Sequence, residues 1–292
     1  MTPTNLIILD EAPEDYYVRR LDEANASGLK QMLRSPAHFK HWAENPDDDK
    51  SSPALDFGRA FHCATLEPDV FASTYVVLPD DAPQRPTVAM LNAAKPSDSS
   101  RERIAWWERF NADAVGKLIL SAADYDRAQR MADSIRSHPV AAGLLVGGDR
   151  EVTFRWQDED TGIACKARAD LYLPGEYLMD VKTCRDASHE GFARAVASYQ
   201  YALQQAHYLS GIRHCGDTIR WFVFLAIEST EPFVCQPHVL DVQAEQLGES
   251  LRVKAMNRQA ECLQSGRWPG YSDQLNELSL PAWAYYQLED AA

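Results

Sequence analysis

The spacing of apolar residues changes near the middle of the chain, and this change limits the folds that the sequence can adopt. From Glu151 to Trp156 apolar and polar residues alternate, which indicates a half-buried strand. Residues 164–173 and 177–183 are typical of two further strands, and the Pro174-Gly175 turn between them makes the three strands a meander. The largely apolar run from Ile219 to Ile227 indicates a central strand covered on both faces.

A long helix is predicted between the third and fourth of these strands. Residues 188–211 place apolar side chains, among them Phe192 and Leu203, on one side. A helix that joins two parallel strands forms a right-handed crossover. We therefore predict an α/β fold class with a mixed central sheet, made of the three-strand meander plus a further strand and flanked by helices.

The rest of the chain divides by composition around this core. Residues 1–26 are acidic, and we expect a flexible lead-in there, followed by a single domain over 27–292. Ser27 is a candidate N-cap for the first helix, and Ser121 for a helix that ends at Ser137. The domain is predicted to comprise a helical part over 27–140 with a Pro-rich loop at 79–100, a sheet core over 150–230, and a C-terminal helix and tail over 238–292.

Composition excludes several classes of protein. The longest strictly apolar run, Trp221–Ile227, is far shorter than the roughly 20 residues of a membrane-spanning helix. The N-terminus has no basic region followed by a long apolar stretch, so we expect a cytoplasmic protein with no membrane partner. The closest of the six cysteines are 19 residues apart, which excludes the usual zinc or iron–sulfur spacing.

The formal net charge of −14 bears on nucleic-acid binding, which usually requires a basic surplus. The surplus of acids is uneven: residues 1–80 hold 14 acids and 7 bases, so half of the net charge lies in about a quarter of the chain. Because net charge does not describe a local cleft, the objection to a nucleic-acid partner stays open.

The candidate chemistry lies on the predicted hairpin. If its turn centres on Gly175, Asp170 lies directly opposite Asp180, and Lys182 projects on the same side as Asp180. Two facing carboxylates are unfavourable unless a cation binds between them, so the pattern indicates a divalent-metal site with an adjacent lysine. The alternative is that both acids are solvated and that Lys182 pairs with one of them, and a slip of one residue would also separate the two acids.

Three further positions add polar groups to this hairpin. Glu151 begins the neighbouring strand and could supply a third carboxylate. Gln204 and Tyr208 are four residues apart and share one face of the long helix, where a surface contact is the alternative interpretation. His62 lies on an earlier predicted helix over 55–66, where a hydrogen-bonded core histidine is the alternative.

Together these residues resemble the RecE-type (exonuclease VIII) branch of the PD-(D/E)XK nuclease superfamily, from about Ser27 to Trp283. The D-x-K element alone is weak, but its combination with the Gln-x-x-x-Tyr helix 22 residues later and the upstream histidine helix is specific. The matching pieces are Leu29 with Ser35-Pro36, Gly58-x-x-x-His62-x-x-x-Leu66-Glu67-Pro68, Glu151, Asp170, Asp180-Val181-Lys182 and Gln204-x-x-x-Tyr208.

The resemblance implies roles for these residues. It implies that one or two Mg²⁺ ions, for which Mn²⁺ can substitute, bind to Asp170, Asp180 and the Val181 carbonyl, with Glu151 and His62 completing or supporting the shell. It also implies that Lys182 activates the attacking water. Gln204 and Tyr208 match residues that contact DNA phosphate or order the site, so the implied catalytic set is Glu151, Asp170, Asp180, Lys182, Gln204 and Tyr208.

For DNA contacts we expect a locally positive channel within an acidic outer surface. Its candidates are Lys166, Arg168, Lys182, Arg185 and Arg194, with Arg59 as a further DNA contact. Arg101, Arg103, Trp106 and Trp107 could hold a strand, although a packed helix explains the two tryptophans equally well.

The resemblance implies a metal-dependent double-stranded DNA exonuclease that resects ends in the 5′→3′ direction and feeds a RecT-like single-strand annealing protein. Similar enzymes form rings, so the resemblance also implies a homotetramer. Two alternatives remain, an endonuclease of the same superfamily and a non-catalytic module that binds DNA ends. The complete set of acids and lysine argues against the second alternative.

Overall fold

A mixed β-sheet lies at the centre of the structure, a computed structural model that describes residues 5–9, 11–46 and 52–281. Strands β5, β6 and β7 form the predicted antiparallel meander, and β8 runs parallel to β7. This confirms the predicted α/β class with a mixed central sheet. The seven strands, in the order β1-β5-β6-β7-β8-β9 with β2 against β6, are β1 (Leu6–Ile8), β2 (Glu23–Ala24), β5 (Asp149–Gln157), β6 (Ala164–Leu173), β7 (Tyr177–Cys184), β8 (Trp221–Glu228) and β9 (Cys235–His238).

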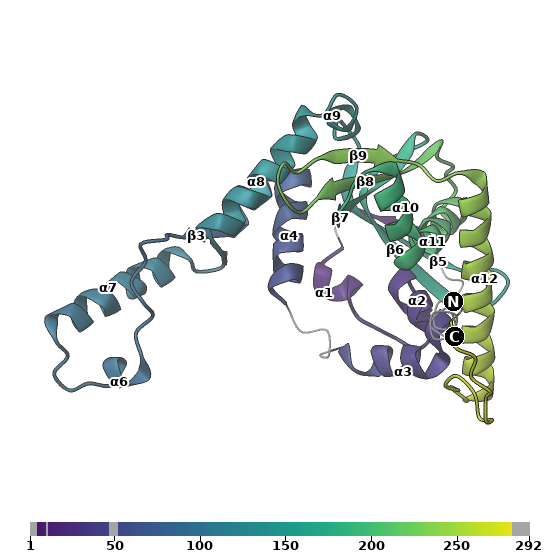
Figure 1. Ribbon diagram of the computed structural model, residues 1–292, viewed down its shortest axis with the longest axis horizontal. Coiled ribbons are helices and arrows are strands. Elements are labelled where there is room, and N and C mark those ends of the chain that lie inside the picture. Colours follow the sequence, from purple (N-terminus) through teal and green to yellow (C-terminus); the bar gives the residue numbers. More distant parts are fainter. Residues whose placement is uncertain (1–4, 10, 47–51, 282–292) are drawn as a thin grey trace, which may run out of the picture.

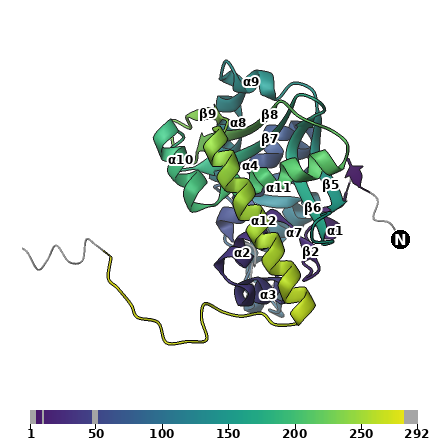
Figure 2. The ribbon, with the colours of Figure 1, turned by 90° about the vertical axis from the view of Figure 1, so that its right-hand side faces the viewer.

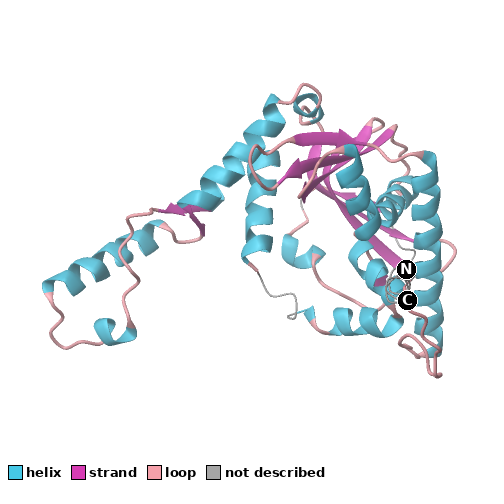
Figure 3. Cartoon of the chain, in the orientation of Figure 1, coloured by secondary structure: helices cyan, strands magenta, loops and turns pink. Residues whose placement is uncertain are grey.

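Helices cover both faces of this sheet, as the cartoon in Figure 3 shows. Helices α2, α3, α10, α11 and α12 contribute to a core on one face, while α4, α5, α8 and α9 contribute to a core on the other. The first group is α2 (Ala26–Arg34), α3 (Pro36–Glu44), α10 (His189–Ser198), α11 (Tyr201–His214) and α12 (Val242–Ser265). The second group is α4 (Pro53–Leu66), α5 (Pro68–Thr74), α8 (Ala122–Ser137) and α9 (Ala141–Leu144).

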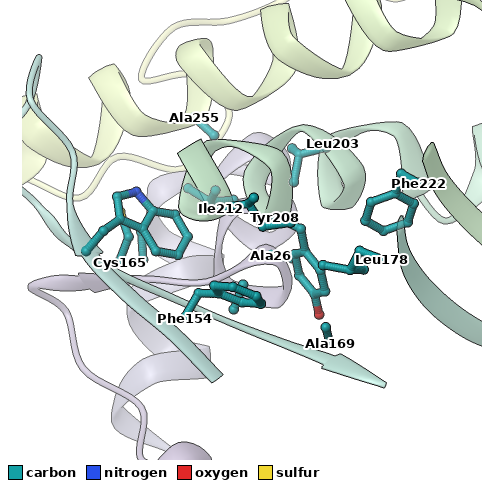
Figure 4. Close-up of a cluster of buried hydrophobic side chains, with 14 of the residues drawn as sticks. Ala26, Phe154, Cys165, Ala169, Leu178, Leu203, Tyr208, Ile212, Phe222 and Ala255 are labelled. Atoms are coloured by element: carbon teal, nitrogen blue, oxygen red, sulfur yellow. The ribbon is translucent and has the colours of Figure 1, made fainter. Parts of the chain in front are cut away.

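The core on the α11 side fixes that helix against the sheet. Leu203 and Ile212 of α11 lie over Phe154, Ala169 and Leu178 of the meander (Figure 4). Helix α12 in turn packs on α11 and α2 and lies across this side of the molecule (Figure 2). Because α11 lies between the sheet and α12, its side chains that face the sheet are held in place by close packing.

The crossover between β7 and β8 differs from the single helix expected over 188–211. It consists of α10 and α11, separated by a break at which Gln200 adopts a left-handed conformation with φ 53°. Helix α11 is buried along most of its length, whereas the end of α10 is exposed. The break lets the chain turn so that α11 can lie against the sheet, and no glycine or proline marks it in the sequence.

The N-terminal segment is part of the sheet, so the expected flexible lead-in is wrong for its described residues. Strand β1 pairs antiparallel with β5, and the short helix α1 (Pro13–Tyr16) follows it. Acidic residues in the segment form ion pairs with the sheet: Glu11 with Arg155, and Glu23 with both Arg155 and Lys166. These acids therefore neutralise basic side chains of the sheet.

The two N-caps proposed from sequence have different outcomes. Ser121 accepts a hydrogen bond from the backbone N–H of Asp124, as predicted, and caps α8. The first helix, however, begins one residue before Ser27, and Asn25 caps it by accepting from the N–H of Gly28. Ser35 then caps a separate helix, α3, so that Ser35-Pro36 begins a new helix.

Residues 75–121 form an arm that projects away from the sheet (Figure 1). Its base is a two-stranded parallel sheet of β3 (Tyr75–Leu78) and β4 (Leu118–Ser121), and beyond it lie α6 (Val88–Leu91) and α7 (Asp98–Asp113). The Pro-rich loop expected at 79–100 therefore contains α6 and the first turn of α7. Trp107 is buried within the arm, where its indole N–H donates to the Pro83 carbonyl at 2.9 Å.

The described helices include none with the length and apolar content that crossing a membrane requires. Part of the predicted C-terminal tail, residues 282–292 with Trp283, lies outside the described residues, as does the acidic stretch 47–51.

Candidate active site

A row of three carboxylates crosses the meander. The hairpin pairs Leu171 with Met179 in the predicted register, and Asp170 and Asp180 are the next residues along the two strands. On the other side of β6, the pairs Arg150↔Leu171 and Val152↔Ala169 flank Glu151 and Asp170, which places Glu151 across from Asp170. Acids on three adjacent strands therefore lie in one line.

The sheet is irregular along this row. Glu151 adopts a left-handed conformation with φ 51°, which costs a non-glycine residue on the order of 1 kcal/mol. On β6, Ala169 packs in the core on the α11 side, whereas Leu171 packs in the core on the α4 side, although a regular strand would keep both on one face. The pleat therefore changes sides at Asp170.

The change of pleat gives the Asp170 carboxylate a position between two strands. The described ladder of β6 and β7 stops at Leu171↔Met179, and the backbone N–H of Val181 donates to Asp170 Oδ2 at 2.6 Å. His62 approaches the same oxygen from α4, with Nδ1 3.6 Å away. The structure thus brings His62 close to the carboxylate row.

Burial and mutual repulsion make it unfavourable for all three carboxyl groups of this row to be ionised at once. Burial, and then the charge of Asp170, raises the pKa of Glu151 to about 8. The pKa of Asp170 is also raised, by burial first, although His62 acts in the opposite direction. Without a cation, at least one proton is therefore retained in this cluster near neutral pH.

Lys182 and Gln204 are held by Asp180. The Lys182 ammonium forms an ion pair with Asp180 Oδ2, and Gln204 Nε2 donates to Asp180 Oδ1 at 2.6 Å. Burial alone would lower the pKa of Lys182, but Asp180 and Asp170 outweigh it, and the net pKa is raised. Lys182 is therefore a positively charged group next to the carboxylates.

Of the two roles that the resemblance implies for Tyr208, its burial favours ordering of the site over contact with DNA. Its side chain is only 7% exposed and belongs to the core on the α11 side, with its ring centre 6.0 Å from that of Phe222. Figure 4 shows the hydroxyl directed toward Ala169. The spacing that puts Tyr208 on the face of Gln204 turns both toward the sheet, so Tyr208 supports the site from within.

The expected positive channel is not formed by Lys166 and Arg168. These side chains are buried, and Lys166 Nζ donates to the Val18 carbonyl at 2.6 Å. Arg168 pairs with Glu11 at 3.4 Å, so it is a structural residue and not an available DNA contact. The N-terminal segment neutralises both, which could not be read from local sequence.

Of the other expected DNA contacts, Arg185, Arg59 and Arg194 lie at the surface, whereas Gln204 is buried. Arg185, just after β7, is exposed. Arg59 lies one turn before His62 on α4 and is 3.8 Å from Asp56. Arg194 is 4.0 Å from Glu190 on α10, so its charge is partly balanced.

Two residues at the site escaped sequence analysis. Lys30 of α2 donates a 3.4 Å hydrogen bond to Gln204 Oε1. Tyr201 at the start of α11 lies beneath both lysines, with Lys30 Nζ 5.1 Å and Lys182 Nζ 5.0 Å from its ring centre. Lys30 lies in the predicted opening helix and Tyr201 beside Gln204, but only tertiary packing brings them together.

The donor chemistry of the row fits a divalent cation. Carboxylate oxygens and a backbone carbonyl are ligands that Mg²⁺ prefers, and an added cation would favour the charged form of Glu151, whose pKa is raised by burial and then by the charge of Asp170. Asp180 Oδ2 is buried and accepts no hydrogen bond among the described residues, its contact being the ion pair with Lys182. Within those residues no three His, Cys, Asp or Glu side chains form a ready-made cage, so binding requires side-chain adjustment.

This fold and this arrangement of acids and lysine define a PD-(D/E)XK-type domain. The chain belongs to the family of PDDEXK-like domains of unknown function (DUF3799), whose family model matches residues 25–281. The PD-(D/E)XK part of the predicted resemblance is therefore confirmed, while the RecE-type branch stays a prediction.

The comparison with solved structures gives a match along nearly the whole chain. The chain is similar in fold to a crystal structure from Eubacterium rectale described as "Putative exonuclease", with 13% sequence identity and a TM-score of 0.56. The match covers 95% of this chain and 98% of that chain. A comparison with curated proteins finds no match.

Proposed function

We propose that the chain is a metal-dependent DNA nuclease that hydrolyses phosphodiester bonds. The observation that carries the proposal is the row Glu151–Asp170–Asp180 with Lys182 beside it. A buried cluster of acids with raised pKa values is costly as structure alone, and such clusters are typical of sites that bind a cation and do chemistry. Membership in the PDDEXK-like family supports the same function.

Asp170, Asp180 and Glu151 would hold Mg²⁺ or Mn²⁺, with the Val181 carbonyl and His62 as further candidate ligands. One or two such ions would neutralise charge on the phosphate and stabilise the leaving oxygen. Lys182 is positioned to orient the attacking water, because its ammonium lies against Asp180. Gln204 fixes the carboxylate of Asp180 by its 2.6 Å hydrogen bond and so acts as a positioning residue.

Within this class we propose an exonuclease acting on double-stranded DNA ends in the 5′→3′ direction. The single strand it leaves would be passed to a RecT-like annealing protein, and a homotetrameric ring would retain the product strand. The resemblance of the sequence to RecE-type nucleases supports these finer assignments, and the fold match to a protein described as an exonuclease is consistent with them.

The test compares linear duplex with covalently closed circular duplex in the presence of Mg²⁺. An exonuclease degrades the linear DNA and leaves the closed circle intact, whereas an endonuclease cleaves both. Labels on the 5′ and 3′ ends identify the strand that is lost and hence the direction.

Loss of the catalytic groups provides the matched control for this assay. Asp180→Ala and Lys182→Ala should abolish cleavage while the circular dichroism spectrum stays that of the wild type. Full activity of Asp180→Ala would contradict the proposed nuclease site. If the wild type binds DNA ends without cleaving them, the result favours a non-catalytic module.

A further inference from the structure

Lys30 brings a second ammonium group to the candidate active site. Its Nζ and that of Lys182 lie 5.1 and 5.0 Å from the centre of the same Tyr201 ring. The two lysines come from separate elements, α2 and β7, so the juxtaposition is a product of the tertiary fold. An aromatic face attracts each cation, but it does not balance two positive charges.

The charge of Lys30 is poorly compensated within the site. Lys182 has the carboxylate of Asp180, whereas no carboxylate of the described residues lies within 4.0 Å of Lys30 Nζ. The hydrogen bond to Gln204 is long, at 3.4 Å. Burial, and then the charge of Lys182, lowers the pKa of Lys30 to about 8. A half-buried lysine beside another lysine is unfavourable alone and becomes favourable when an anion binds.

An aromatic surface adjoins these two lysines. Tyr199 is 62% exposed, and its ring stacks on Tyr201 with centres 5.6 Å apart and planes at 27°. The left-handed Gln200 between them sets this arrangement at the break of the crossover. An exposed aromatic ring next to cations is suited to stacking on a nucleic-acid base while a neighbouring cation contacts the phosphate.

We propose that Lys30, Tyr199 and Tyr201 form a nucleotide subsite beside the carboxylate row. Lys30 binds a phosphate oxygen of the DNA strand, and Tyr199 stacks on the adjoining base. The inference rests on the proposed nuclease function, because the subsite would hold the strand that the site cleaves. The matched motifs assign no role to these residues, so they constitute an addition to the site.

The first test measures binding of a 3′-labelled duplex by fluorescence anisotropy in Ca²⁺ for Lys30→Gln, Lys30→Arg and wild type. Lys40→Gln is the matched control, because Lys40 pairs with Glu44 on the surface of α3. Loss of one phosphate contact should weaken binding by Lys30→Gln about tenfold at low salt and reduce the salt-dependence slope by about 0.9. Lys30→Arg and Lys40→Gln should keep the wild-type slope.

The second test addresses the base. Tyr199→Ala should weaken binding about tenfold with an unchanged salt slope, and Tyr199→Phe should bind like the wild type, since stacking needs the ring and not the hydroxyl. Thermal unfolding of each variant in the absence of DNA checks that the fold is intact, and Lys30→Arg keeps the test decisive if Lys30→Gln is unstable.

The source of the phosphate is resolved by comparing duplexes with a 5′-phosphate and a 5′-hydroxyl. A Lys30→Gln defect confined to the 5′-phosphorylated duplex identifies a terminal phosphomonoester, and an equal defect on both identifies an internal phosphodiester. Wild-type affinity and salt slope in Lys30→Gln would overturn the subsite while leaving the nuclease proposal intact. A wild type that neither binds nor cleaves DNA would overturn the proposed function itself.

Discussion

Gln204 is the residue through which α11 reaches the carboxylate row. Replacing it with Ala removes the 2.6 Å hydrogen bond to Asp180 and leaves that carboxylate free to turn. Loss of an outer-shell partner of a metal ligand typically costs about 10–100-fold in activity or metal affinity. We expect a loss of this size in the rate of linear duplex degradation, with partial recovery at high Mg²⁺.

The matched control is Gln205→Ala on the adjacent position of α11. Gln205 donates to Glu245 of α12 at 2.8 Å and does not contact the row. Its replacement should affect unfolding and leave cleavage per folded molecule unchanged. Equal losses of activity in the two variants would contradict a positioning role for Gln204.

The raised pKa of Glu151 predicts that the stability of the metal-free protein depends on pH. Its pKa is raised from 4.5 to about 8, so the native state keeps a proton that the unfolded chain loses. The contribution of this group to the free energy of unfolding therefore falls as pH rises from 4.5 to 8. In EDTA, the wild type should lose a few degrees more in Tm than Glu151→Gln between pH 6 and 8.5, an effect on the order of 1 kcal/mol.

Metal should reverse this trend, because a bound cation competes with the proton on Glu151. The increase in Tm on adding Mg²⁺ should grow between pH 6 and pH 8 in the wild type. Scanning calorimetry provides both measurements. A pH-independent metal effect in the wild type would mean that Glu151 stays outside the metal shell.

At the scale of elements, the position of α11 depends on its close contact with α12. A Cβ atom on Gly248 would lie 2.2 Å from the Ala202 carbonyl oxygen, so Gly248→Ala forces the two helices apart. We expect a loss of about 1–3 kcal/mol in the free energy of unfolding. Activity per folded molecule should also fall, since α11 carries Gln204.

Gly58 on α4 supplies the comparison for this substitution. A Cβ there would meet nothing within 4 Å, so Gly58→Ala should be neutral or stabilise the protein by up to about 1 kcal/mol. Urea unfolding of both variants measures the difference. Similar stability of the two would show that the α11–α12 contact can relax at little cost.

The elements that were predictable from sequence are those specified by local patterns. Alternation and the turn at Gly175 fixed the meander and the opposition of Asp170 and Asp180, because register in a tight hairpin follows from its turn. The break at Gln200 and the left-handed Glu151 carry no local signal and depend on packing. The prediction that Lys166 and Arg168 line a DNA channel was wrong for the same reason, because their ion-pair partners lie about 150 residues away in the sequence.

At the scale of the whole molecule, the outer part of the arm, residues 80–116, contributes nothing to either core of the sheet, whereas Tyr75 and Leu120 at its base belong to the core on the α4 side. Trp107 is buried against residues of the arm itself and belongs to neither core of the sheet. Replacing residues 80–116 with a flexible linker of about eight residues should change the free energy of unfolding of the remainder by no more than about 1 kcal/mol. Urea unfolding of full-length and arm-deleted protein tests this, and loss of a cooperative transition would contradict it.

Because the net charge is −14, we expect the proposed binding of DNA by the whole molecule to depend on metal. Much of the basic surface expected near the site is neutralised by the N-terminal acids, so the carboxylate row repels DNA until a cation loads. We expect duplex affinity at least about tenfold higher in Ca²⁺ than in EDTA at low salt. Anisotropy titrations at matched ionic strength measure it, and equal affinity in the two conditions would contradict it.

The pairing of β1 with β5 also determines when the sheet can be completed during synthesis of the chain. Leu6–Ile8 leaves the ribosome before its partner residues 153–155, which follow about 145 residues later. At elongation rates of about 5–20 residues per second, this apolar segment waits roughly 7–30 s without its strand neighbour. An unpaired apolar strand is a template for association with other chains, so the nascent protein is most prone to aggregation before β5 emerges.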